Sequence, residues 1–126
     1  MAMEFVILIG MGFLIAMLVV VLIYDMNKER SLERTDSKMR DFAYTVQSEI
    51  ILASEMNDGY QRNITLNEEI EKTDYSIYIM EISNFTQLSI GYDDKTINYR
   101  IPNVEGIIDK GNNLLRNING TVNITQ

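Results

Sequence analysis

The sequence predicts an α+β fold in which one long N-terminal helix packs against a small antiparallel β-sheet. The chain begins with an uncharged apolar run, continues with apolar residues at helical spacing, and then changes to alternating apolar and polar residues. We therefore expect an apolar helix at 1–24, an amphipathic continuation of that helix at 25–57, and a β domain at 58–126.

The first segment has the length and composition of a membrane-spanning helix. The run from Phe5 to Tyr24 carries no charge. About twenty residues at roughly 1.5 Å rise each cross a hydrocarbon core of about 30 Å. A removable secretory signal has a shorter apolar core and a basic start, whereas the α-amino group is the only positive charge before this run. We expect the segment to remain as a single-pass anchor.

The second segment continues the helix because it lacks Pro and Gly and keeps a helical apolar spacing. Its first turns are strongly charged and should be solvated, with Asp36 and Arg40 able to pair four residues apart. The tripeptide Asn57-Asp58-Gly59 suits a left-handed helix stop. The apolar stripe comprises Leu32, Met39, Phe42, Val46, Ile50 and Ala53.

The third segment reads as paired strands joined by turns. Alternation predicts strands at 75–82, 87–92 and 96–101, with a turn at Asp93-Asp94-Lys95 and an end at Pro102. Near the end of the sequence, LLRNI and TVNIT flank Asn119-Gly120. Both residues tolerate positive φ, so a hairpin is expected there.

The orientation of the chain in a membrane is indicated by two opposed signals. Basic residues follow the span and favour a cytoplasmic C-terminal side; they are Lys28, Arg30, Arg34, Lys38 and Arg40. If a basic leader had been removed, the basic residues counted on the N-terminal side of the span would be incomplete. Four N-x-T sequons, where chance would give roughly one, favour export; their asparagines are Asn63, Asn84, Asn119 and Asn123. We expect an external C-terminal domain with these four as N-glycosylation candidates.

Composition argues against catalysis and against nucleic-acid binding. The formal charge is −7 and no basic face is evident, so nucleic acid is not an expected partner. The chain has neither Cys nor His, which removes thiol nucleophiles and the commonest general base and metal ligand. Acidic pairs such as Asp93-Asp94 lack the spacing of a calcium loop and read as solvated turns. We expect no enzymatic activity, no cofactor and no metal.

The residues Ala2-Met3-Glu4-Phe5, followed by an apolar helix, an amphipathic extension and a β-rich tail, resemble archaeal pilins of the type IV superfamily. These proteins carry class III signal peptides. The segments ASEMNDGYQRNITL at 53–66 and VEGIIDKGNNLLRNINGTVNI at 104–124 also look like parts of small archaeal pilin-like proteins.

The resemblance implies a type IV pilin-like fold and a structural role. The chain would be a major or minor subunit of a pilus-like surface filament used for adhesion, held in the cell membrane before assembly. Its implied partners are identical or related pilin subunits, a prepilin-type peptidase, and an assembly ATPase with its platform. Glu4 and Phe5 would be assembly residues, with 1–24 in the filament core.

Glu4 is an acid at the edge of the apolar run, where burial costs several kcal/mol unless the charge is paired. The terminal amine of an adjacent subunit would be a suitable partner, and the positive end of the helix dipole adds about 0.3–1 kcal/mol. The alternative is a solvated flanking residue.

The position of Glu4 leaves a second hypothesis open. The glutamate of mature pilins is usually the fifth residue after the cut, whereas here it is the fourth. If Met1 is the true start, the peptidase has no site to cut. The chain would then be a single-pass, membrane-anchored pilin-like binding module that does not polymerise.

Overall fold

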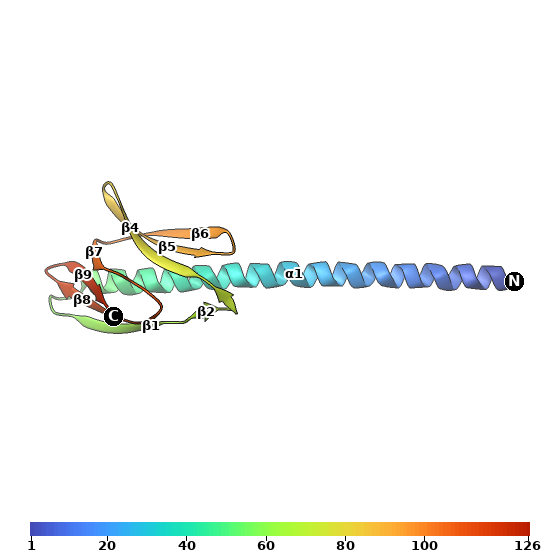
Figure 1. The fold of residues 1–126 in the computed structure, drawn as a ribbon, viewed down its shortest axis with the longest axis horizontal. Coiled ribbons are helices and arrows are strands. Elements are labelled where there is room, and N and C mark those ends of the chain that lie inside the picture. The colour runs from blue at the N-terminus through green and yellow to red at the C-terminus, as the bar shows by residue number, and fades with distance from the viewer. The chain divides into compact units, whose positions relative to one another are not determined.

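The computed structural model describes residues 1–126, in which one helix precedes nine strands (Figure 1). Helix α1 spans Ala2–Glu55, so the long N-terminal helix predicted from the sequence is confirmed. The chain forms two compact units, Met1–Arg34 and Thr35–Gln126, and α1 contributes to both. The boundary falls inside the predicted amphipathic segment, at the point where helix side chains begin to be buried.

The second unit contains all of the strands. They form a four-stranded sheet of order β1-β8-β9-β7, a two-stranded sheet of β2 and β3, and a three-stranded sheet of order β4-β5-β6. Their bounds are β1 Gln61–Leu66, β2 Glu69–Ile70, β3 Thr73–Asp74, β4 Ser76–Ile82, β5 Phe85–Tyr92, β6 Lys95–Ile101, β7 Val104–Gly106, β8 Gly111–Ile118 and β9 Thr121–Thr125.

The strands form more sheets than the single small antiparallel sheet that the alternation predicts. There are three sheets, and β7 pairs with β9 in parallel. Gly106 permits this pairing, because a Cβ atom placed there would lie 2.1 Å from the carbonyl oxygen of Ile124. Its φ of +103° also favours glycine. Strands β1, β2, β3 and β7 were not predicted.

The core of the second unit lies between the last turns of α1 and the sheets. Of the predicted stripe, Met39, Val46, Ile50 and Ala53 are buried, Phe42 is half-buried, and Leu32 is 49% exposed. Each fully buried aliphatic side chain contributes about 1.5–3 kcal/mol through removal from water. The buried strand residues opposite the helix include Leu88, Ile90, Leu115, Val122 and Ile124.

The predicted turns are confirmed. β5 ends at Tyr92 and β6 begins at Lys95, with φ of 44° at Asp93 and 60° at Asp94. Asn119 and Gly120 join β8 to β9 with φ of 53° and 84°. Short polar residues and glycine adopt these left-handed conformations at low cost, which is why the sequence signals were reliable.

The C-terminal end of α1 is held by a side chain from β8. The Nδ2 of Asn117 donates to the carbonyl oxygens of Ala53 at 2.9 Å, Ser54 at 3.3 Å and Met56 at 2.8 Å. Its Oδ1 accepts from the backbone N–H of Gly120 at 2.9 Å. Asn117 is 1% exposed, so it satisfies orphan helix carbonyls and the β8–β9 turn from inside the protein.

Candidate membrane and assembly segment

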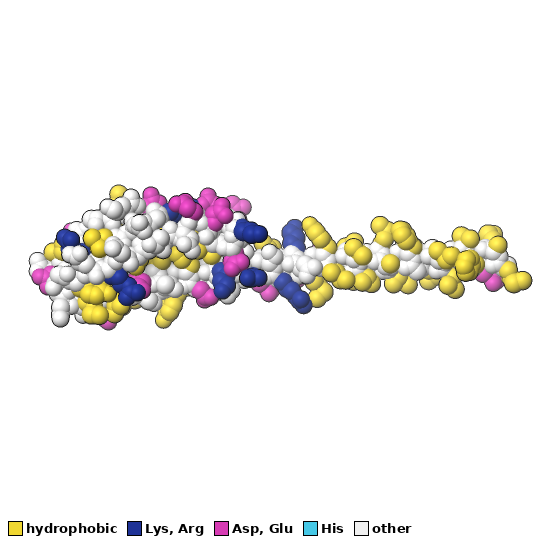
Figure 2. Space-filling view, turned by 90° about the horizontal axis from the view of Figure 1, so that it is seen from below, with side chains coloured by type: hydrophobic (Ala, Val, Ile, Leu, Met, Phe, Trp, Pro, Cys, Tyr) yellow, Lys and Arg dark blue, Asp and Glu magenta, His cyan; other side chains and the backbone are white.

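In the first unit, the uncharged helical residues from Phe5 to Tyr24 are all exposed. An 18-residue window has a mean hydropathy of 3.2, and none of it is buried (Figure 2). The helix is therefore long and apolar enough to cross a membrane. A helix that is hydrophobic all round requires lipid or neighbouring helices as its surroundings.

Glu4 and Phe5 lie where the sequence places them, at the start of this surface. Glu4 is the acidic residue in the first turn of α1. The backbone N–H of Phe5 donates to the carbonyl oxygen of Met1 at 3.3 Å, so the helical turn already includes the first residue. The Phe5 ring is 66% exposed. Both side chains are thus available to another chain or to lipid.

A polar cluster stabilises the first turns of α1 in the second unit. Lys95 Nζ donates to Asp36 at 3.1 Å and 2.8 Å, and the Tyr92 hydroxyl donates to Asp36 Oδ1 at 3.0 Å. The hydrogen bond from Lys95 holds the pKa of Asp36 below its usual range, and Tyr92 and Arg40 add to that effect. The predicted pairing of Asp36 with Arg40 is thus secondary, because Lys95 lies closer to the carboxylate.

Replacing Asp36 with asparagine should reduce stability at neutral pH, and the difference from the wild type should shrink as the pH falls below the usual pKa of an aspartate. The folded-state pKa of Asp36 is lowered, so its contribution is present above the unfolded value and is lost as the pH falls through the folded one. Thermal unfolding of both proteins between pH 3 and 7 measures this. Asp94→Asn is the control, since Asp94 is an exposed residue of the neighbouring turn. Parallel pH profiles for wild type and Asp36→Asn would contradict the role of the cluster.

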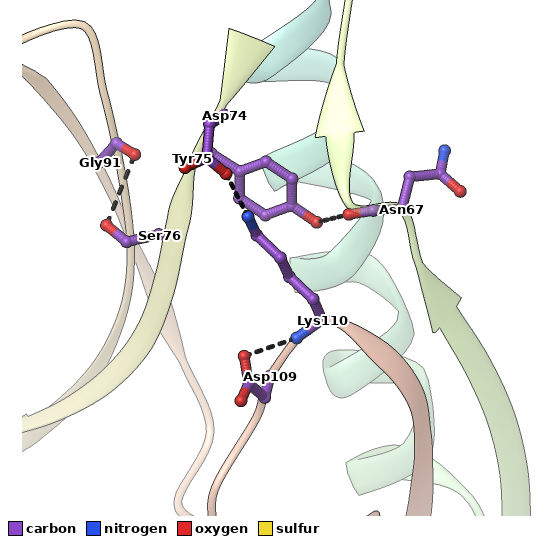
Figure 3. A network of polar contacts seen from close by, with 7 residues as sticks. All are labelled: Asn67, Asp74, Tyr75, Ser76, Gly91, Asp109 and Lys110. Atoms are coloured by element: carbon purple, nitrogen blue, oxygen red, sulfur yellow. Dashed lines mark hydrogen bonds and ion pairs between the residues drawn. The ribbon is translucent and has the colours of Figure 1, made fainter. Parts of the chain in front are cut away.

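A second network joins the β2–β3 region to the loop before β8 (Figure 3). Lys110 forms an ion pair with Asp74 and lies 4.7 Å from the centre of the Tyr75 ring. The Tyr75 hydroxyl donates to the carbonyl oxygen of Asn67. Burial raises the pKa of Tyr75 to about 12, and the hydrogen bond from Lys110 lowers the pKa of Asp74. These contacts join the β2–β3 region to the loop before β8.

The four sequons occupy different environments in the second unit. Asn63 lies on β1, Asn84 in the turn between β4 and β5, and Asn119 in the turn between β8 and β9, and all three are exposed. Asn123 lies on β9 and is half-buried. Asn84 and Asn119 lie in turns and Asn123 lies on a strand, as the sequence predicts, whereas Asn63 lies on a strand that was not predicted.

Asn117 and Lys95 each bond a residue far away in the sequence, and neither role was predicted. A signal for Asn117 existed, because Asn113 and Asn117 alternate with Leu115 on the inward face of β8. Polar residues at core positions demand hydrogen-bond partners. The partner of Lys95 could not be predicted from the sequence, because Asp36 lies 59 residues earlier.

Comparisons of this chain with protein families, with curated proteins and with solved structures found no match.

Proposed function

We propose that the chain is a structural subunit of a type IV pilus-like surface filament, assembled through its apolar N-terminal helix. The observation that carries the proposal is the contrast between the two units. Residues 35–126 bury their own core, whereas the apolar window of the first unit buries nothing. That surface needs a hydrophobic environment that the chain itself does not supply.

Assembly would exchange lipid for neighbouring helices around the same apolar residues. Lipid tails are as apolar as these side chains, so the exchange gains little from hydrophobic transfer and depends on packing and paired charge. Glu4 is the single carboxylate at this end of the helix, and the terminal amine of another subunit is the cation that the chain offers for it. The pairing would fix the stagger between subunits.

The second candidate is a single-pass, membrane-anchored pilin-like module that does not polymerise. It is favoured by the match between the uncharged run from Phe5 to Tyr24 and the thickness of one bilayer. The charged residues that begin at Asp25 would then mark the interface. Both candidates place the helix in a membrane at some stage, so membrane association alone does not separate them.

Electron microscopy of sheared cell-surface material, with mass spectrometric identification of the fibre subunit, tests the proposal. We expect the chain in helical filaments and also in the membrane fraction as an unassembled pool. Abundance in membranes together with absence from sheared fibres would reject the filament role and favour the anchored module. Mass spectrometry of the native N-terminus adds an independent readout, because peptidase processing accompanies assembly in the pilins that the chain resembles.

A further inference from the structure

We infer that Asn63 is the principal N-glycan acceptor of the folded chain and that Asn84 is not an acceptor. The inference rests on the external placement of residues 35–126 that the proposed function requires. The inference concerns a covalent modification, so it can be tested whether or not the chain polymerises. The reasons lie in the local geometry of each sequon.

Strand geometry presents the asparagine and the threonine of the Asn63 sequon on the same face of β1. Residues two apart in a strand point to the same face. Asn63 and Thr65 are both exposed, whereas Leu66 on the opposite face of β1 is buried. Recognition of an N-x-T sequon needs access to the asparagine amide and to the threonine hydroxyl together. Asn63 is the one sequon of this chain in which both residues are exposed.

The surroundings of Asn63 leave room for a sugar. β1 is an edge strand, paired only with β8. A groove of about 280 Å³ also borders this part of β1, lined on the helix side by Thr45 and Glu49 and on β1 by the consecutive residues 62–66, which include Asn63 and Thr65. The Thr65 hydroxyl donates to Asn112 Oδ1 at 2.8 Å in an exposed position, so it keeps accessible lone pairs.

An ion pair fixes the wall of the same groove. Arg62 Nε lies 2.9 Å from Glu49 Oε2, without the alignment of a hydrogen bond. The pair joins β1 to α1 beside the sequon. The pairing of β1 with β8 keeps the strand extended at the sequon.

Asn84 has an exposed amide but a hidden hydroxyl. Thr86 is 5% exposed, and its Oγ1 donates to Asn103 Oδ1 at 3.3 Å. An open depression of about 500 Å³ borders this sequon, so space does not limit it. The limit is the hydroxyl, which the fold has buried on β5. Modification of Asn84 would require local unfolding of the β4–β5 hairpin.

The two remaining sequons are intermediate in the exposure of their asparagine and threonine side chains. Asn119 is exposed in its turn, but Thr121 is half-buried. Asn123 is half-buried on β9, a central strand between β8 and β7, where Arg116 and Glu105 are its cross-strand neighbours. Each therefore lacks one of the two accessible groups that Asn63 offers.

The chemistry requires a membrane transferase and a lipid-phosphate-linked oligosaccharide as the co-reactant. The amide nitrogen Nδ2 of Asn63 forms a bond to the anomeric carbon of the first sugar. The bond from that carbon to the lipid phosphate oxygen breaks, and the lipid phosphate leaves with the electron pair. Nδ2 loses one proton to a base of the transferase. No oxidant or reductant is involved.

Intact-mass and glycopeptide mass spectrometry of the full chain from its native host tests the inference. We expect Asn63→Gln and Thr65→Ala each to remove one glycan mass, and Thr65→Ser to retain it. Asn84→Gln is the matched control and should leave the mass of the glycans unchanged. Equal occupancy of Asn84 and Asn63 would overturn the inference, since it would show modification before folding. An unmodified Asn63 in the wild-type chain would also overturn it, whether or not filaments form.

Discussion

Replacing Asn117 with alanine is expected to lower the free energy of unfolding of the second unit by about 2–4 kcal/mol. The substitution removes the donor to the carbonyl oxygens of Ala53, Ser54 and Met56 and the acceptor for the Gly120 N–H. A buried polar group left without a partner costs about 1–3 kcal/mol. One side chain makes all four bonds, so their losses are not independent and the total stays below their sum.

Urea denaturation of the full chain in detergent, followed by circular dichroism, measures this loss. Asn112→Ala is the matched control, because Asn112 is an exposed asparagine of the same strand with one exposed side-chain hydrogen bond. It should cost less than 1 kcal/mol. Equal midpoints for Asn117→Ala and Asn112→Ala would show that β8 does not hold the helix end.

Asn117→Asp separates the two functions of the side chain. The aspartate keeps an acceptor for the Gly120 N–H but loses the Nδ2 donor to the helix carbonyls. It also places a negative charge at the negative end of the helix dipole. We expect it to be at least as destabilising as alanine. A stability equal to the wild type would assign the effect to the turn alone.

Features governed by neighbouring residues could be predicted from the sequence. The long helix follows from apolar spacing without Pro or Gly, and the turns at Asp93-Asp94 and Asn119-Gly120 follow from residues that accept positive φ. Strand β6 ends at Ile101 because Pro102 cannot donate to the ladder. Each of these signals operates within a few residues.

Features that join distant residues could not be predicted in this way. β1 pairs with β8 across about fifty residues, from Gln61 opposite Arg116 to Leu66 opposite Gly111. The sequence QRNITL alternates weakly, so β1 becomes a strand through its pairing with β8. The same limit applies to the Asp36–Lys95 pair and to the parallel contact of β7 with β9. Periodicity indicates which face of a strand or helix is buried, but it does not indicate which distant segment packs or pairs with it.

The candidate functional residues were likewise predictable only in part. The apolar run and Glu4 could be located from the sequence alone, because charge and hydropathy are properties of the residues. The sequons could also be located, but their accessibility could not. Whether Thr65 or Thr86 is buried depends on which face of β1 or β5 meets the core.

Replacing Glu4 with glutamine is expected to reduce filament yield at least tenfold while leaving the membrane pool of the subunit in place. Glutamine keeps the size and helix propensity of the side chain and removes only the charge. In an apolar filament interior, an unpaired terminal amine would cost several kcal/mol, and each 1.4 kcal/mol corresponds to a factor of ten in an equilibrium. Yield is measured by quantifying the chain in sheared filaments and in membranes.

Glu29→Gln is the control, because Glu29 is also an exposed helix glutamate but lies beyond the apolar run. Its loss removes one charge from the same helix without touching the apolar surface, so filament yield should stay near the wild-type level. Glu4→Asp should fall between the two, since the carboxylate is kept but its reach is one methylene shorter. If Glu4→Gln and Glu29→Gln give equal yields, Glu4 is a solvated flanking residue. Assembly would then depend on helix packing alone, and the stagger between subunits would have to be fixed by side chains further along α1.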